Sequence, residues 1–336
     1  MKQFIIAEAG VNHNGDINLA FDLIKVAAEC GADAVKFQTF KAENLAAKDT
    51  PKVAYQTVDR PESEESHYEM LKRLELSNED TVKVKRCCEE HGVEFMSTPY
   101  DPEGVEFLAK IGSRRLKVAS ADLVDFRIQR AVRRSGLSVI QSMGMATEDE
   151  VLGWHEEFRR EAPGQHRTLL QCTSNYPSDP FNANLRAMKA MGEKLGVDYG
   201  FSDHTSDHRA TVLAVALGAT VVEKHFTLDR TMKGPDHKAS VDPVELRDYV
   251  QAVRDADAIL GSDIKDICEE EMDMRRISRK GVFALRDLAS GQTIREEDFT
   301  FHRPGTGVDM GNFLQVLGSV LKKSLSRGEL LSQDHI

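Results

Sequence analysis

Two histidines, His204 and His225, each follow a short apolar run of the kind that forms a buried β-strand. If the two runs are neighbouring parallel strands, the two imidazoles lie side by side at one end of a sheet. A single histidine at a strand end is more often a hydrogen-bonded rim residue. A pair of neutral imidazoles, however, suits Mn2+, Fe2+, Co2+ or Zn2+, and we expect a metal site. The carboxylates in reach are Glu8, Asp203, Glu223 and Asp236.

Two lysines, Lys36 and Lys117, lie inside otherwise apolar runs. A buried ammonium group has to face a polar cavity or a counter-ion, because its desolvation is otherwise costly. Two such groups indicate an anion site, although an ion pair with Glu8 or Asp122 would explain either lysine alone. Hydroxyl side chains at the ends of nearby runs could donate to phosphate oxygens, unless they only cap turns or helices. They are Ser97, Thr98, Ser120 and Ser142.

Several familiar motifs are absent from the sequence. It contains neither a GxxxxGK(S/T) loop nor a GxGxxG loop after a strand, so nucleoside triphosphate and dinucleotide sites lack their phosphate loops. The five cysteines show no CxxC spacing, and there is no HExxH helix. We therefore expect reduced cysteines and neither a structural zinc site nor a metalloprotease site.

The length and charge of the chain narrow the class of protein. Its 336 residues, with 40% hydrophobic and 29% charged side chains, are typical of a folded globular protein. A net charge of -11 disfavours nucleic-acid and anionic-membrane partners, whereas a few lysines in a cleft can still hold one small anion. No run reaches the ~18 apolar residues of a membrane span, and the apolar run at 4–7 is too short for a secretory signal, so we expect none. These features predict a cytoplasmic protein.

An alternation of short apolar runs and amphipathic segments, up to about residue 260, must position the candidate residues. This pattern is typical of β-α units around a parallel sheet, with helices expected for example over 18–30, 78–91 and 102–111. Eight such units predict an α/β fold, the (β/α)8 TIM barrel, in which reactive residues follow the C-terminal ends of the strands. The predicted strands are 4–8, 34–38, 93–97, 116–119, 138–142, 168–172, 198–202 and 220–224.

The chain changes character after the predicted barrel domain, 1–261. Residues 262–276 are charged, include an acidic run at 269–271, and are predicted to form a linker. Residues 277–336 contain short strand-like runs separated by glycines, which predicts a small, mostly β domain. A domain this small has little core of its own. We expect it to lean on another surface, either its own barrel or that of a partner.

Four stretches resemble the sialic acid (N-acetylneuraminate) synthase family, in the order in which that family shows them. They are IAEAGVNHNGD at 6–16, VKFQTF at 35–40, GFSDHT at 200–205, and 223–237, which begins EKHFTLD and ends GPDH. The tail, with RPGTG at 303–307, is similar to that family's antifreeze-like (SAF) domain. The resemblance covers essentially the whole chain and implies a TIM barrel followed by a SAF domain.

The resemblance implies an enzyme that condenses phosphoenolpyruvate with an N-acylated mannosamine-type amino sugar. The product would be a nine-carbon α-keto acid, and phosphate would leave by C–O cleavage. One alternative is another phosphoenolpyruvate-dependent barrel synthase that makes a keto-deoxy sugar acid, but such an enzyme would not be expected to carry the SAF tail. The other alternative is a noncatalytic carbohydrate- or ice-binding protein. It would need neither the two lysines within strands nor the paired histidines.

The resemblance also implies a role for each candidate residue. His204 and His225 would hold a divalent metal, Mn2+ or Mg2+. Arg303 would reach from the SAF domain of one subunit to the N-acyl group in the barrel of the other, which implies a domain-swapped homodimer. The catalytic residues would be Glu8, Asp122 and Lys117. The substrate-binding residues would be Lys36, Thr98, Ser120, Ser142 and Ser202 around phosphoenolpyruvate, and Gln38, Tyr176 and Asp236 around the sugar.

Two departures from the family pattern bear on the site. Residues 120–122 read SAD where many members carry SGE, so a shorter carboxylate must serve near the metal. Sialic acid synthases often carry an Asn before the tyrosine motif of strand six, where this chain reads CTSNY over 172–176. Together with the long insertion 44–76, this leaves two acceptors open. One is N-acetylmannosamine, and the other is the 2,4-diacetamido-6-deoxy sugar that legionaminic acid synthases use.

Overall fold

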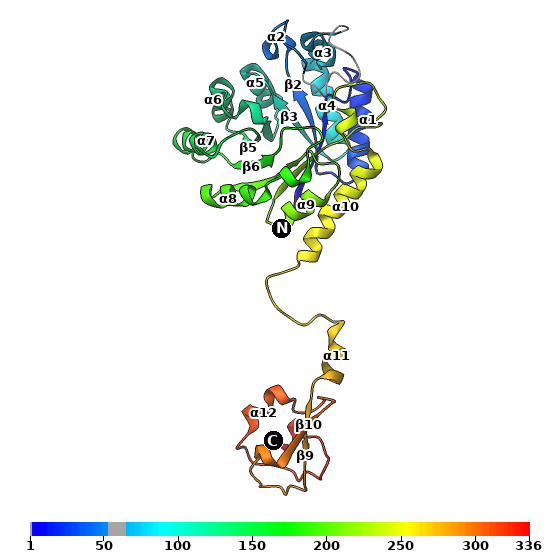
Figure 1. The fold of residues 1–336 in the computed structure, drawn as a ribbon, viewed down its shortest axis with the longest axis vertical. Coiled ribbons are helices and arrows are strands. Elements are labelled where there is room, and N and C mark those ends of the chain that lie inside the picture. The colour runs from blue at the N-terminus through cyan, green and yellow to red at the C-terminus, as the bar shows by residue number, and fades with distance from the viewer. Residues whose placement is uncertain (1, 53–64) are drawn as a thin grey trace. The chain divides into compact units, whose positions relative to one another are not determined.

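The computed structural model describes residues 2–52 and 65–336 and separates into two compact units, Met1–Gly261 and Ser262–Ile336. Figure 1 shows the first unit as a ring of strands with helices around it. Every predicted strand is present within two residues of its expected ends, and the predicted TIM barrel is confirmed. The strands are β1 Phe4–Gly10, β2 Ala34–Thr39, β3 Glu94–Pro99, β4 Arg115–Val118, β5 Ser138–Ser142, β6 Arg167–Cys172, β7 Asp198–Asp203 and β8 Val221–His225.

The eight strands are parallel and follow the order β3-β2-β1-β8-β7-β6-β5-β4. Because β3 and β4 stand at the two ends of this order, the ladder of hydrogen bonds in the described residues stops between them. The order places β1 beside β8, and Glu8 on β1 pairs with His225 on β8. Closure of the barrel thus brings the beginning and the end of the first unit's sequence to one place.

Side chains alternate between the barrel interior and the layer beneath the helices, because successive strand residues point to opposite faces. One apolar side chain from each of six strands joins the interior cluster, namely Ile6, Ala34, Met96, Ile140, Leu170 and Val221. Two positions later, each of these strands presents a polar or charged residue to the same interior, closer to its C-terminal end. These residues are Glu8, Lys36, Thr98, Ser142, Cys172 and Glu223.

Helices are present between the strands as predicted, and their apolar faces pack on the outer surface of the barrel in one large core. No helix in the described part of the chain is long and apolar enough to cross a membrane. The barrel helices are α1 Ile17–Glu29, α4 Asn78–Glu90, α5 Pro102–Lys110, α6 Phe126–Ser135, α7 Glu148–Glu161, α8 Leu185–Leu195, α9 Arg209–Ala216 and α10 Pro243–Leu260.

The insertion after β2 contains two short helices, α2 Ala42–Leu45 and α3 His67–Leu74. With Val11 and Phe40 they form a small apolar cluster that is separate from the main core. Part of the predicted insertion, 53–64, lies outside the described residues. The described part supplies one wall of a cavity at the barrel mouth.

The second unit has an apolar core of its own, and the predicted small β domain is confirmed. Its two strands, β9 Gly281–Ala284 and β10 Phe299–His302, pair in antiparallel fashion, and α12 Met310–Val316 follows them. A short helix, α11 Glu271–Ser278, precedes β9 and overlaps the end of the predicted linker 262–276.

Acid should destabilise the barrel through His13, which is 1% exposed in the loop after β1. Its Nδ1 accepts a hydrogen bond from Gly15 N at 3.0 Å, so this nitrogen carries no proton. Burial lowers the pKa of His13 to about 4, below the ordinary 6.5. The unfolded chain therefore binds a proton that the folded chain excludes, and the free energy of unfolding falls as the pH decreases from about 6.5 to about 4.

We expect His13 to account for a loss of about 1.6 kcal/mol between pH 6.5 and pH 5, since the slope approaches about 1.4 kcal/mol per pH unit only below pH 6.5. Denaturant unfolding of the wild type and of His13→Gln at both pH values measures this loss. The variant lacks the titrating ring, so its stability should fall by about 1.6 kcal/mol less. An equal decrease in the two proteins would contradict the prediction.

Candidate active site

A buried chain of charges crosses the barrel just above its apolar interior. Glu8, Lys36, Lys117 and Glu223 are each no more than 4% exposed. Lys36 Nζ lies 2.9 Å from Glu8 Oε2 and 3.7 Å from Glu223 Oε2. Lys117 Nζ lies 3.8 Å from Glu223 Oε1. Lys36 thus has the expected ion pair with Glu8, whereas the carboxylate that faces Lys117 is Glu223 and not Asp122.

The two carboxylates among these four buried charges, Glu8 and Glu223, differ in their protonation. Burial raises the pKa of Glu8 to about 7, against the opposing effect of Lys36. Burial also acts to raise the pKa of Glu223, but Lys117 and Lys36 outweigh it and lower that pKa to about 2. Burial lowers the pKa of Lys117. At neutral pH, Glu223 is therefore a fixed negative charge, while Glu8 can gain or lose a proton.

Each lysine also contacts a hydroxyl group from a neighbouring strand. Lys36 Nζ donates a hydrogen bond to Thr98 Oγ1 at 3.1 Å, and Lys117 Nζ donates to Ser142 Oγ at 2.6 Å. The four side chains come from four strands, β2 to β5. Ammonium and hydroxyl donors in this arrangement can bind a small, multiply charged anion.

The other predicted serines lie on either side of this group. Ser202 Oγ donates to Glu223 Oε1 at 2.9 Å. Ser120 Oγ accepts from Gly144 N at 3.0 Å. A Cβ on Gly144 would lie 2.6 Å from Ser174 Oγ and 2.8 Å from Ser120 Oγ, so only glycine fits between the two hydroxyls.

His204 and His225 are neighbours, as the sequence predicts. Their ring centroids are 5.4 Å apart, and the ring of Tyr176 lies 4.1 Å from that of His204. His204 Nδ1 donates to Thr173 O at 2.8 Å, and its other ring nitrogen, Nε2, lies 3.5 Å from Ser202 Oγ. Burial lowers the pKa of His225 well below its ordinary value and keeps this ring neutral.

The two imidazoles fit a divalent cation, because each can offer an unprotonated ring nitrogen and His204 is held through its other nitrogen. In residues 2–52 and 65–336, no group of three or more His, Cys, Asp and Glu side chains is arranged to hold a metal ion. A metal at this place would therefore complete its shell with water or substrate oxygens, which leaves positions open for a reacting group.

A cavity of about 270 Å3 opens beside the histidines at the barrel mouth. One side of it is polar and includes Gln38, Tyr176, His225 and Asp236. Gln38 Nε2 lies 3.5 Å from Glu8 Oε1, so the cavity reaches the chain of charges. Its apolar lining comes from Val11 and from the insertion after β2, namely Leu45, Met70, Leu71 and Leu74, and His67 of α3 also lines the cavity.

Glycine at position 10 allows the polar side of this cavity to converge. Gly10 has φ +53°, and a Cβ there would meet Glu8 Oε1 at 3.3 Å, Gln38 Nε2 at 3.4 Å and Asp236 Oδ2 at 3.6 Å. Burial raises the pKa of Asp236 to about 6. Three predicted site residues from three segments of the chain therefore surround one backbone position.

The remaining predicted site residues are Asp122 and Arg303. Asp122 is on a short 3-10 helix, Ser120–Leu123, and in the described residues its Oδ2 is buried without a hydrogen-bond partner. Burial and Asp125 raise its pKa to about 7. Arg303 belongs to the second unit, where its exposed guanidinium donates through Nε to Ser278 O at 2.8 Å.

Two residues at the site are missing from the predicted catalytic and substrate-binding set. Glu223 is expected only as a carboxylate near the metal, yet it stands between both lysines. Cys172 Sγ lies 3.7 Å from His204 Nδ1. Burial acts to lower the pKa of His204, but the opposing effect of Cys172 is among those that raise this pKa above its ordinary value. Strand parity could have found both residues, because Glu223 lies two positions before His225 and Cys172 ends its strand on the interior face.

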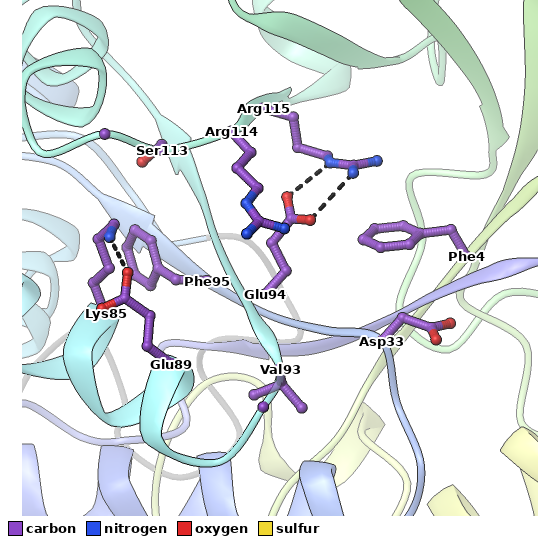
Figure 2. A pocket seen from close by; sticks show the side chains of 12 residues that line it. Phe4, Asp33, Lys85, Glu89, Val93, Glu94, Phe95, Ser113, Arg114 and Arg115 are labelled. Carbon is purple, nitrogen blue, oxygen red and sulfur yellow. Dashed lines mark hydrogen bonds and ion pairs between the residues drawn. The ribbon is translucent and has the colours of Figure 1, made fainter.

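A second cavity, of about 590 Å3, lies at the opposite end of the barrel, where the strands begin (Figure 2). Arg115 at the start of β4 donates to Glu94 at the start of β3 through Nε at 2.7 Å and Nη2 at 3.1 Å. Asp33 pairs with Arg254, and Lys85 with Glu89. Because most charges here are neutralised by neighbours and barrel enzymes react at the other end, this larger cavity is not the candidate active site.

The fold and the site define a (β/α)8 barrel with buried ammonium and hydroxyl groups in its interior, beside two histidines and a cavity of about 270 Å3. Residues 23–265 match the NeuB family, and residues 279–336 match the SAF domain. The chain belongs to the NeuB family and is a phosphoenolpyruvate-dependent nonulosonic acid synthase. The predicted family and reaction class are thereby confirmed, and the noncatalytic alternative is excluded.

Known members resemble the chain over its whole length. It is 42% identical to the N,N'-diacetyllegionaminic acid synthase of Legionella pneumophila, over 100% of this chain and 95% of the relative. It is 38% identical to the enzyme of the same name from Campylobacter jejuni, over 99% of both chains. The crystal structure of a sialic acid synthetase from Leptospira borgpetersenii, in complex with citrate, has a TM-score of 0.71 at 32% identity and covers 82% of this chain and 90% of its own.

Proposed function

We propose that the buried charges bind phosphoenolpyruvate and that the mouth cavity binds the acceptor sugar. One observation supports this proposal, namely that the buried charges adjoin the mouth cavity. Gln38 and His225 line the cavity, Gln38 contacts Glu8, and Glu8 pairs with His225 across β1 and β8. A sugar in the cavity would therefore present its aldehyde carbon beside an anion held by Lys36 and Lys117.

The lysines and their hydroxyl partners would hold the phosphate and carboxylate of phosphoenolpyruvate. The third carbon of this substrate forms the new C–C bond with the sugar aldehyde, and water adds to its second carbon before phosphate leaves. Glu8 is suited to accept the proton of that water, because its pKa of about 7 permits both protonation states at neutral pH. Glu223 stays charged and holds both ammonium groups in place. Asp122 remains a prediction for a second proton-transferring group.

We propose His204 and His225 as ligands of the divalent metal that NeuB-family members commonly use. Imidazole nitrogens favour Mn2+ over Mg2+, which prefers oxygen ligands. When bound, the metal would polarise the aldehyde oxygen of the acceptor. Tyr176 and Asp236, which lie beside the histidines, would orient the sugar hydroxyl groups. We place the reaction in the cytoplasm, where phosphoenolpyruvate is produced.

We propose 2,4-diacetamido-2,4,6-trideoxymannose as the acceptor. The two diacetyllegionaminic acid synthases described above support this choice, and so does the apolar side of the cavity. Met70 and Leu71 are 3% and 8% exposed and offer no hydrogen bond from their side chains. A methyl group at carbon 6 can pack against such a wall, whereas a hydroxymethyl group would lose hydrogen bonds to water there.

Two sugars that differ only at carbon 6 test the acceptor. We expect kcat/KM for phosphate release with Mn2+ to be about tenfold to a hundredfold higher for the 6-deoxy analogue of N-acetylmannosamine than for N-acetylmannosamine itself. The variant Met70→Gln, which adds hydrogen-bonding groups to the wall, should reduce this ratio. Equal rates with the two sugars would contradict the apolar-wall argument. Phosphate release in a reaction that contains no amino sugar would contradict the proposed reaction.

We also propose a domain-swapped homodimer in which Arg303 contacts the N-acyl group in the partner's barrel. Replacing Arg303 by alanine should raise the sugar KM by about tenfold to a hundredfold, the effect of losing one charged hydrogen bond. The KM for phosphoenolpyruvate should change little. Steady-state kinetics with each substrate varied in turn measure both values, and Arg295→Ala in the same unit is the matched control. An unchanged sugar KM would remove the proposed role of Arg303.

A further inference from the structure

A second buried ion pair lies directly behind the two histidines. Asp203 precedes His204, Lys224 precedes His225, and their side chains are 0% and 2% exposed. Asp203 Oδ2 lies 3.2 Å from Lys224 Nζ. The two residues are register partners on β7 and β8, so the pair connects the two strands that carry the histidines.

This pair faces away from the active site. Strand alternation turns both side chains toward the layer beneath α9 and α10, and Asp203 is therefore not a carboxylate in reach of the metal, contrary to expectation. Thr211 on α9 donates to Asp203 Oδ2 at 2.7 Å, and Lys224 Nζ lies 5.6 Å from the ring centroid of Tyr249 on α10. The pair contacts neither the sugar cavity nor the chain of buried charges.

The same two side chains hold the backbone that follows His204. Asp203 Oδ1 accepts hydrogen bonds from Thr205 N and Thr205 Oγ1, each at 2.8 Å. Lys224 Nζ donates to Thr205 O. Residues on both sides of His204 are therefore bound to a lysine that is itself the neighbour of His225. A shift of one imidazole relative to the other would break several of these contacts.

Stability alone is a weak reason for such a pair. Burying two charges is costly, and apolar side chains of similar size often stabilise a core equally well or better. A pair that positions neighbouring ligands would, in contrast, require these particular charges. Outer contacts that orient metal ligands commonly change metal affinity by about 10- to 100-fold.

We propose that Asp203 and Lys224 are positioning residues that set the separation of His204 and His225 and thereby the affinity for the divalent metal. This inference rests on the metal site proposed above. It assigns the pair no contact with substrate. Loss of the pair should weaken metal binding even in a folded chain.

Mn2+ binding to the full-length chain tests the inference without reference to turnover. Free Mn2+ is measured by its electron paramagnetic resonance signal for the wild type, Asp203→Asn, Lys224→Met and the double variant. We expect each single variant to bind Mn2+ about 10- to 100-fold more weakly. Because the two residues act as one unit, the double variant should bind no more weakly than the weaker single variant. Thermal unfolding without metal shows which variants are folded.

A matched control is the cross-strand pair at the other end of the barrel, Glu94 and Arg115 (Figure 2). Glu94→Gln should reduce thermal stability but leave the Kd for Mn2+ unchanged. If Lys224→Met does not fold, Asp203→Asn alone tests whether the pair sets the affinity for Mn2+. Its asparagine keeps an acceptor for Thr205 N. Wild-type affinity in a folded Asp203→Asn variant would overturn the inference. Failure of the wild type to bind Mn2+ would overturn the metal site itself, and the inference with it.

Discussion

Replacing His225 by alanine should reduce the condensation rate by about a thousandfold, the largest effect that we expect from a single substitution. The physical reason is the loss of one of two imidazoles that would hold the cation at the acceptor aldehyde, since such a cation supplies several kcal/mol of charge stabilisation. Its ring centroid lies 5.4 Å from that of His204, and in the described residues no further cluster of metal-binding side chains could replace it. The rate of phosphate release with saturating Mn2+ measures the effect.

The matched control for this substitution is His208→Ala, because His208 is an exposed histidine at the start of α9. This variant should retain wild-type activity and Mn2+ affinity. Thermal unfolding should show that His225→Ala remains folded, since the ring is half-buried at the mouth and not part of the apolar core. Normal, chelator-resistant turnover by His225→Ala would refute the assignment of the metal site.

Glu8→Gln should reduce kcat by about 100- to 10,000-fold, the range typical of a lost general base. Glutamine preserves the shape of the side chain, and Lys36 keeps Glu223 as a counter-ion at 3.7 Å, so the KM for phosphoenolpyruvate should change little. Because burial raises the pKa of Glu8 to about 7, the wild-type carboxyl is protonated below that pH. The wild-type rate should therefore fall as the pH decreases through 7.

The pH–rate profile separates this role from a structural one. In Glu8→Gln the residual rate should lack the decrease near pH 7, since no carboxyl remains to be protonated. A structural defect alone would lower the rate at every pH and leave the shape of the profile unchanged. Retention of more than about a tenth of the wild-type kcat would contradict the role of Glu8 as a base.

Much of the barrel could be predicted from local sequence. Parallel strands buried on both faces have to be apolar, so the runs at 34–38 and 138–142 are recognisable without knowledge of their neighbours. A lysine inside such a run, as at Lys36, signals a polar layer for the same reason. The second unit was equally recognisable from its short runs and glycines.

Other features of the site depend on which strands adjoin. Glu223 stands between Lys36 and Lys117 because β8 closes against β1 on one side of it and the barrel interior brings β4 across from it. No local sequence pattern indicates how close Glu223 lies to the two lysines. The apolar wall from α3 also could not be predicted from local sequence, since an isolated amphipathic helix does not indicate which cavity it covers.

The sequence by itself determined the strands and the residue types that face the interior, because strand parity and hydrophobic pattern are local properties, and the resemblance of its motifs to a known family indicated the class of enzyme. Only the tertiary structure decided which side chains contact one another. It placed Glu8 beside His225, directed Asp203 toward Lys224 and away from the site, and left Asp122 Oδ2 buried without a hydrogen-bond partner in the described residues. Ring closure joins residues that are remote in the chain, and the pKa of each buried group depends on the charges that this closure brings near it.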